Sequence, residues 1–158
     1  MFQDIRGALD TEGFNYEVQH QEEDRQILKA GFNCPNGNVV TWIDMRPDEE
    51  AFIINAHCPI HVDSKKEFEV LKLLNGLNAR TYLGHWEYEA ENGMIKLRAA
   101  QAAGGPFPVH GPTFMKIYRS VIESMDLAIP AIAGVGFASM QADNALHRMM
   151  HGIDPSMN

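Results

Sequence analysis

The chain has 158 residues, of which 45% are hydrophobic and 22% are charged, and it carries a formal net charge of −8. This length supports one well-buried core and is short for two ordinary domains, so we expect a single globular domain. Because the longest basic run is the Lys65-Lys66 pair, the acidic balance argues against nucleic acid and against an anionic membrane as partners.

The sequence shows no signal for export or membrane insertion, and we expect a cytoplasmic protein. Residues 1–6 contain an acid and lack the cationic and then apolar pattern of a secretory signal. The longest apolar run, 127–138, is broken by a proline and two glycines, and it falls short of the ~20 residues of a membrane helix. Cys34 and Cys58 are too few for a disulfide framework, so both are expected to be reduced.

The N-terminal segment predicts a short helix and a polar edge. Apolar residues recur at helical spacing between Phe2 and Gly13, which is typical of an amphipathic helix that ends at a glycine. Residues 19–26 are almost entirely polar. We expect a solvated turn or edge there, with a short strand over 16–18 before it.

Three apolar segments then alternate with turn residues and predict an antiparallel meander. From Ile27 the apolar residues alternate with others, as on a strand with one buried face. Asn36-Gly37 favours a tight hairpin turn, and residues 46–49 form a second turn signal. The expected strands are 27–32, 39–45 and 51–58.

A helix and a hairpin follow. Ser64 and Glu67 have the spacing of a capping box, and the helix after them has an apolar stripe that we assign to the core. The stripe consists of Phe68, Leu71, Leu74 and Leu77. Two strand-like segments, 82–88 and 94–100, are joined by a favoured turn at 91–93. Tyr82, Trp86 and Tyr88 are expected on one face of the first of these strands.

The last part of the chain predicts a connection and a long helix. Glycines and prolines between 104 and 112 favour a surface connection. Thr113 is a suitable N-cap for the last helix, which Pro130 is expected to kink or interrupt. Residues 131–150 can be helical again, with small residues that permit close packing, and the residues from 152 onward are expected to be frayed.

These elements predict an α+β fold in which an antiparallel sheet of about five strands packs against helices, in the order α-β-β-β-α-β-β-α. This order, together with Leu83-Gly84-His85-Trp86-Glu87-Tyr88 turning at Asn92-Gly93 into Met94-Ile95-Lys96-Leu97-Arg98, resembles the YbjN-like family of bacterial sensory transduction regulators. The last helix, from Ile117-Tyr118 to Ile129-Pro130, is similar also.

The resemblance extends roughly from Phe2 to Phe137. It implies the fold of type III secretion chaperones, which are small, acidic and commonly dimeric, and which hold an extended segment of a partner. We therefore expect a YbjN-like domain over 1–137 and a C-terminal helical extension and frayed tail over 138–158.

The strongest candidate for chemistry is His57-Cys58-Pro59-Ile60-His61, because thiolate and imidazole bind zinc. A structural zinc site needs about four ligands, and Cys34 is the only other cysteine. Strand alternation places His57 and Cys58 on opposite faces. We therefore favour a solvent-facing His57 and a buried Cys58, while metal binding by His57, Cys58 and His61 stays open. A cysteine nucleophile is favoured less, because no oxyanion-donor loop is visible nearby.

Three weaker patterns have structural explanations that we favour. The acidic runs 22–24 and 48–50 lack the ligand spacing of a calcium loop. The glycines within 134–136 lack the third glycine of a phosphate loop and suit close helix packing. His147 and His151 can share a helix face and would bind a metal only weakly.

The sequence therefore favours a non-enzymatic chaperone-like or regulatory adaptor that binds a protein segment through the sheet face or an edge strand, without a cofactor. The alternative is a small-molecule sensing domain with a pocket between the sheet and the last helix. A homodimer is also expected, because the apolar C-terminal residues need covering. The candidate interface residues are Tyr118, Met125, Met140, Leu146, Met149 and Met150.

Overall fold

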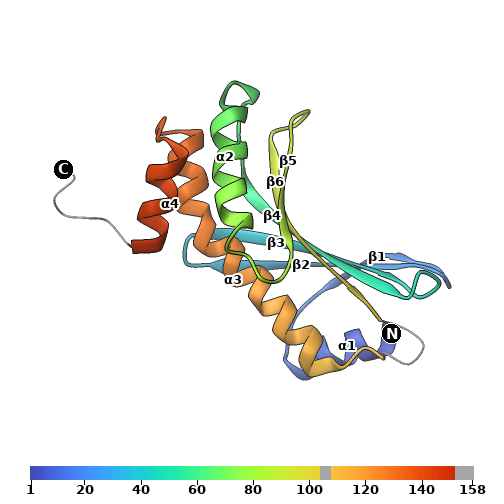
Figure 1. Ribbon diagram of the computed structural model, residues 1–158. Helices are drawn as coiled ribbons and strands as arrows, with labels where there is room; N and C mark the ends of the chain where they lie inside the picture. Colours follow the sequence, from blue (N-terminus) through green and yellow to red (C-terminus); the bar gives the residue numbers. More distant parts are fainter. Residues whose placement is uncertain (104–107, 152–158) are drawn as a thin grey trace.

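A computed structural model describes residues 1–103 and 108–151. Within these residues a six-stranded antiparallel sheet has the strand order β1-β2-β3-β4-β6-β5, and the helices cover one of its faces (Figure 1). The strands are β1 (Glu17–Gln21), β2 (Gln26–Cys34), β3 (Gly37–Arg46), β4 (Ala51–His61), β5 (His85–Glu89) and β6 (Met94–Ala102). The helices are α1 (Phe2–Thr11), η1 (Ser64–Lys66), α2 (Glu67–Asn78), α3 (Gly111–Gly136) and α4 (Ala142–His151).

The predicted α+β fold is confirmed, and its sheet gains one strand beyond the approximate five. The additional strand, β1, pairs with β2 through an irregular register around Val18. Its side chains are mostly exposed, so it lacks the apolar alternation that reveals a half-buried strand. The predicted hairpins are present: Cys34 pairs with Gly37, and Gly93 adopts a φ of 74° between β5 and β6.

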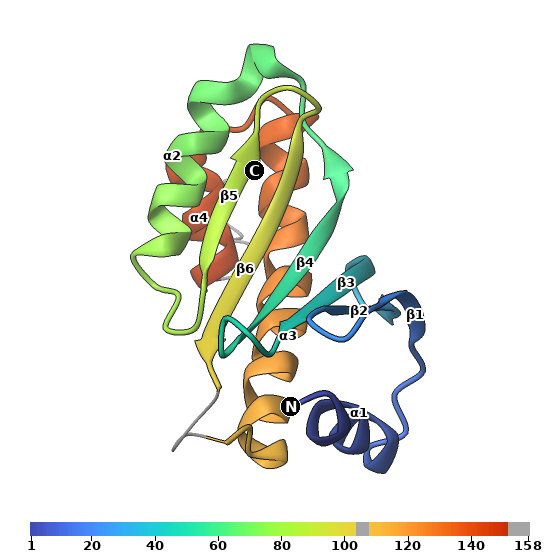
Figure 2. The same cartoon turned by 90° about the vertical axis from the view of Figure 1, so that its right-hand side faces the viewer.

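The core lies between the sheet and α3. Phe114 of α3 stacks on Tyr118, with ring centroids 5.6 Å apart, and meets Phe52 of β4 edge to face at 5.4 Å. Phe14 and Phe32 each meet the Tyr118 ring edge to face, with ring centroids 5.8 Å apart. This aromatic cluster holds the long helix diagonally across the sheet (Figures 1 and 2).

Helix α2 differs from its prediction in start and in buried face. The Asp63 carboxylate accepts a hydrogen bond from the Lys65 amide at 2.8 Å and caps the short helix η1. Helix α2 follows η1 with Lys66 at its N-cap position and no side-chain cap, so the predicted Ser64–Glu67 pair does not form. Phe68 is 77% exposed and Leu71 is 48% exposed. The buried face consists of Val70, Leu73, Leu74 and Leu77. This face shares only Leu74 and Leu77 with the predicted stripe.

The loop between α2 and β5 corrects a second prediction. Tyr82 precedes β5 and is fully exposed, whereas Trp86 is buried. Trp86 is held by α2 and this loop: its backbone N–H donates to the Asn78 side chain at 2.7 Å, and its indole N–H donates to Thr81 Oγ1 at 3.0 Å. Trp86 thus packs toward the helices as predicted, without Tyr82.

Pro130 does not interrupt the last helix, because α3 continues to Gly136. The proline ring is exposed, while Ile129, Ile132 and Val135 extend the buried face past it. The apolar area that these side chains bury offsets the cost of about 3 kcal/mol for an internal proline.

Helix α4 packs against both α2 and α3. Asp143 forms an ion pair with Lys72 of α2 at 2.6 Å, and the Ala142 amide donates to the Glu69 carboxylate at 2.7 Å. Gly134 of α3 leaves room for the Met140 thioether, which would be 3.3 Å from a Cβ at that position. The expected close packing by small residues is therefore confirmed. The predicted frayed residues 152–158 and part of the predicted connection, 104–107, lie outside the described residues.

Candidate protein-binding surface

The second face of the sheet carries no helix in the part of the chain that the structure describes (Figure 2). We call it the open face. Strand alternation places apolar, aromatic and charged side chains together there. Its half-buried members are Ile27, Lys29, Val40, Trp42, Ile53, Asn55, His57, Lys96 and Arg98.

One row of residues crosses the open face from strand to strand. Trp42 of β3 is paired with Lys29 on one side and Asn55 on the other. Asn55 is paired with Arg98 of β6, which in turn is paired with His85 of β5. The Lys29 ammonium lies 5.3 Å from the centre of the Trp42 ring, which is within the range of a cation–π contact. We call Lys29, Trp42, Asn55 and Arg98 the cross-strand row.

The β5–β6 side of the open face carries an ion-pair network. Lys96 contacts Glu89 at 2.7 Å and Glu87 at 3.0 Å. The hydrogen bond to Glu89 raises the pKa of Lys96. Burial alone would raise the pKa of Glu87, but its bonds with Lys96 and His85 outweigh burial and leave that pKa lowered. Burial lowers the pKa of neighbouring His57, and Lys96 adds to this effect. His57 is therefore neutral near pH 7.

A second network lies at the far end of β3. The Asp44 carboxylate accepts two hydrogen bonds from Arg25, at 2.8 and 2.9 Å, and two from Arg46, at 2.9 and 3.1 Å. Burial would raise the pKa of Asp44, yet the two guanidinium groups together hold it below its ordinary value. Arg46 also pairs with Glu49 at 3.0 Å, so two carboxylates of the protein itself balance the two arginines.

The predicted histidine–cysteine cluster is separated by the sheet. The two residues lie on opposite faces and Cys58 is buried on the core face, as predicted, whereas His57 is half-buried on the open face and not fully solvent-facing. Burial raises the pKa of Cys58 to about 11, so its thiol stays protonated at neutral pH. His61 lies further along, with Nδ1 3.0 Å from the Asn92 carbonyl. Among the described side chains, no three His, Cys, Asp or Glu residues gather into a metal-binding group. Cys34 and Cys58 are free thiols.

The C-terminal interface residues fall into two groups. Tyr118 and Met125 are fully buried beneath the sheet, so neither has surface to offer a second copy; this part of the prediction is corrected. They face the core because the apolar stripe of α3 points toward the strands. Met140, Leu146 and Met149 are half-buried, and Met150 is 49% exposed. Met140 and Met149 line a cleft of about 350 Å³ between α3 and α4, beside the 60% exposed Leu127.

Two further hollows bear on ligand binding. The larger of the two, about 680 Å³, lies between α1 and α3 and is lined by small residues such as Gly7 and Ala8 and by charged residues such as Lys116 and Arg119. The alternative hypothesis places a pocket between the sheet and α3. The rings of Phe52, Phe114 and Tyr118 pack together in the middle of that space. A cleft of about 310 Å³ remains at the beginning of α3.

The open face is partly visible in the sequence. Alternation from Ile27 indicates that the strands have one buried face, but it does not show which side chains become neighbours on the other face. The cross-strand row depends on register, which the turns between strands determine.

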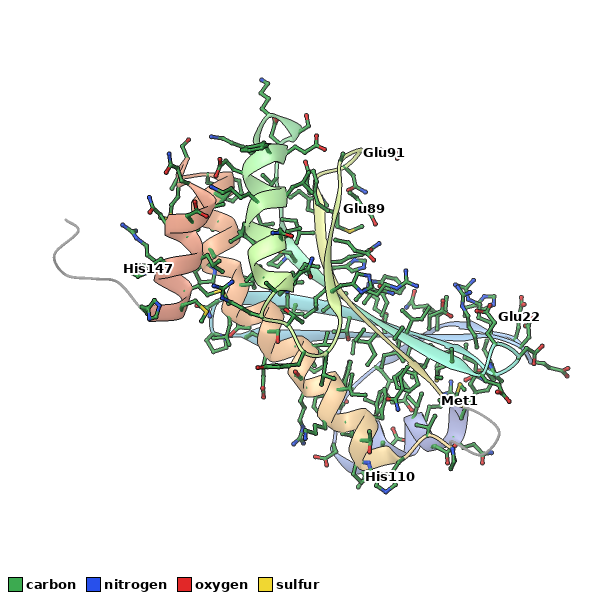
Figure 3. The ribbon with its side chains drawn as sticks, in the orientation of Figure 1. Met1, Glu22, Glu89, Glu91, His110 and His147 are labelled. Carbon is green, nitrogen blue, oxygen red and sulfur yellow. The ribbon has the colours of Figure 1, made fainter. Side chains whose placement is uncertain are left out.

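Figure 3 places Glu89 on the sheet side of the molecule and His147 on α4, across the helix layer from it.

The helices also bear on the membrane question. Within residues 1–103 and 108–151, none combines the length and the apolar content that a bilayer crossing requires.

Comparisons with known proteins agree with this architecture. The sequence matches the family YbjN, described as “Putative bacterial sensory transduction regulator”, over residues 2–131. The search of curated proteins gave no match. The fold is similar to “Crystal Structure of the ExsC-ExsE Complex”, with 12% identity and a TM-score of 0.58, over 80% of this chain and 89% of that chain. It is similar also to “Crystal structure of YbjN, a putative transcription regulator from E. coli”, with 15% identity and a TM-score of 0.57, over 82% and 88% of the two chains. The likeness to these structures establishes the fold alone.

Proposed function

Because this chain belongs to the YbjN family, we propose that it is a non-enzymatic regulatory or chaperone-like adaptor that binds a segment of a partner protein. The binding site is the open face of the sheet. The proposal is carried by one observation: Trp42 is only half-buried in the middle of a sheet face that no helix covers in the described structure. Tryptophan in such a position is characteristic of protein contact sites.

The structural neighbours support the same proposal. One of them is a complex between two proteins, ExsC and ExsE, and this chain covers 89% of the matched chain in that structure. By analogy, a chain with the same fold can offer a surface for another polypeptide. We place this activity in the cytoplasm, where Cys34 and Cys58 remain reduced.

A photo-crosslinking amino acid at Asn55, in the middle of the open face, tests the proposal in cells. We expect crosslinks to one protein, identified by mass spectrometry, and loss of the same product in a Trp42→Ala background. Phe68→Ala is the matched control, because Phe68 is an exposed aromatic residue on α2, away from the open face. Equal crosslinking in all three backgrounds would reject the open face. Stabilisation by a metabolite without a protein crosslink would favour the alternative, a small-molecule sensing domain.

We also propose that the chain is a homodimer and that residues 138–158 extend a domain formed by 1–137. The support is the cleft beside Leu127, which leaves Met149 and Met140 partly uncovered. An isologous contact between two copies would bury this patch against itself. Leu127→Asp should convert the dimer into a monomer in light scattering, and Phe68→Asp should not. A wild-type chain that is monomeric at tens of micromolar would refute the dimer.

A further inference from the structure

We propose that the cross-strand row recognises an acidic, extended peptide in which two carboxylates stand four residues apart with an apolar residue midway between them. The inference rests on the proposed function and specifies the chemistry of the partner segment. It assigns Lys29 and Arg98 to the two carboxylates and Trp42 with Asn55 to the residue between them.

The charges on the open face single out these two cations. Arg25 and Arg46 are engaged by Asp44, and Lys96 is engaged by Glu87 and Glu89. Neither Lys29 nor Arg98 forms an ion pair among the described residues. Glu17 is opposite Lys29 across β1, but its carboxylate accepts a hydrogen bond from Gln19 at 3.0 Å instead. In a chain with a net charge of −8, two uncompensated cations on one face are the positions where an external anion gains most.

The spacing of the two cations sets the spacing of the carboxylates. Lys29 lies on β2 and Arg98 on β6, with β3 and β4 between them. Three inter-strand steps of about 4.8 Å separate their backbones by about 14 Å. An extended peptide rises about 3.4 Å per residue, so side chains four residues apart are also about 14 Å apart and point to the same side.

The middle of the row suits an apolar side chain. The Trp42 ring is covered on one side by Lys29 and lies 6.3 Å from the His57 ring. Val40 and Ile53 are half-buried on the same face in the neighbouring rows. An apolar residue placed midway between the two carboxylates would rest between Trp42 and Asn55, where the burial of apolar surface is favourable.

The same charges favour a peptide over a nucleic acid. Asp44 and Glu87 lie in the rows that flank the cross-strand row, and Glu89 lies one row beyond Glu87. A nucleic acid carries a phosphate at every nucleotide and would bring several of them close to these carboxylates. A peptide can place its two acids at Lys29 and Arg98 alone.

The experiment uses the full chain and fluorescent peptides containing acid-Thr-Leu-Thr-acid, followed by anisotropy. Comparison peptides carry the acids two residues apart or replace them with amides, and a single-stranded oligonucleotide is included. We expect the four-residue spacing to bind most tightly, and Lys29→Gln or Arg98→Gln each to weaken it about tenfold. Lys116→Gln, a surface lysine on α3, is the control and should leave binding unchanged.

Charge reversal guards against a merely structural effect. Lys29→Glu with Arg98→Glu should lose the acidic peptide and gain a peptide with lysines at the same two positions. Binding of the amide peptide as tightly as the acidic one would overturn the inference. If Trp42→Ala then abolished the binding of both peptides, the proposed function would still stand. No binding of any peptide by the wild type would also overturn the inference, while crosslinking at Asn55 tests the function separately. Tighter binding of the oligonucleotide would reject both.

Discussion

The phenol oxygen of Tyr118 lies 2.7 Å from the hydroxyl oxygen of Thr41, and both side chains are fully buried between α3 and β3. Thr41 Oγ1 also lies 3.4 Å from the Ala30 carbonyl, so the Thr41 hydroxyl has two hydrogen-bond partners within reach. Burial raises the pKa of Tyr118 to about 12, which keeps the pair neutral. A polar contact thus fixes where the apolar face of α3 meets the sheet.

This arrangement predicts unequal effects of removing the two hydroxyls. Tyr118→Phe should cost about 1 kcal/mol, because Thr41 keeps its bond to Ala30. Thr41→Val should cost about 1–3 kcal/mol, because the phenol of Tyr118 is left buried without an acceptor. The double variant should be less destabilised than the sum of the two, as measured by urea unfolding. Additive losses would contradict the contact.

The two tryptophans predict a second contrast. Trp86→Ala should cost about 3–5 kcal/mol, because it empties a buried site and removes the indole bond to Thr81. Trp42→Ala should cost about 1 kcal/mol or less, because the Trp42 side chain is only half-buried and no helix covers it in the described structure. Urea unfolding of the two variants measures both values. Equal losses would show that Trp42 is a structural residue and not a binding residue.

Asp44 predicts a dependence of stability on pH. Arg25 and Arg46 hold the pKa of this carboxyl below its ordinary value despite its burial, so the folded state favours the ionised form. The stabilisation is complete above the unfolded-state pKa of about 3.9 and is lost as the pH falls through the lower, folded-state pKa. Between pH 7 and pH 5 Asp44 should have little effect on the pH dependence. In chemical unfolding below about pH 4, the wild type should lose stability more steeply than Asp44→Asn; parallel curves would contradict the assignment.

The sequence predicted the order of elements well because turns and alternation are local signals. It predicted the buried face of α2 only in part, because Phe68, Val70, Leu71 and Leu73 are all apolar and lie within two helical turns. Only the packing of α2 against β5, α3 and α4 decides which of them is buried. Pro130 was misleading for the same reason: the packing of Ile129 and Ile132, which stabilises the helix around it, comes from strands far away in the sequence.

The candidate site was predictable only as a face. Alternation indicates that Lys29, Trp42 and Asn55 lie on one side of their strands. Their placement in one row depends on two hairpin registers. The place of Arg98 in the row depends on the pairing of β6 with β4, which α2 and β5 separate in the sequence. Long-range pairing of this kind leaves no pattern in a local window of sequence.

Asp126 predicts that α3 stabilises the turn between β2 and β3. Its carboxylate accepts hydrogen bonds from the Asn36 amide at 2.8 Å and from the Asn36 side chain at 3.3 Å. Asp126→Ala should cost about 1–3 kcal/mol, because the turn N–H loses its partner at a mostly buried position. Asn36→Ala removes only the longer bond and should cost less. Calorimetric unfolding compares the two variants, and the reverse order would contradict the role of the backbone contact.

The contact between Gly76 and Leu146 predicts how α4 is held on α2. A methyl group at position 76 would lie 2.6 Å from Leu146 Cδ2, so alanine there must displace the end of that side chain. Alanine also gains about 1 kcal/mol of helix propensity over glycine. Gly7→Ala in α1 is the matched control, since a methyl group there meets nothing within 4 Å, and it should show the whole gain.

We therefore expect Gly76→Ala to stabilise the protein less than Gly7→Ala and to speed hydrogen exchange in 142–151, as measured by mass spectrometry. Leu146 is half-buried, so it can move at moderate cost and the fold should survive. Adding Leu146→Ala to Gly76→Ala removes the clash, and exchange in α4 should then match that of Leu146→Ala alone. If Gly76→Ala stabilised the protein as much as Gly7→Ala and left exchange in α4 unchanged, the two helices would not be in the contact described.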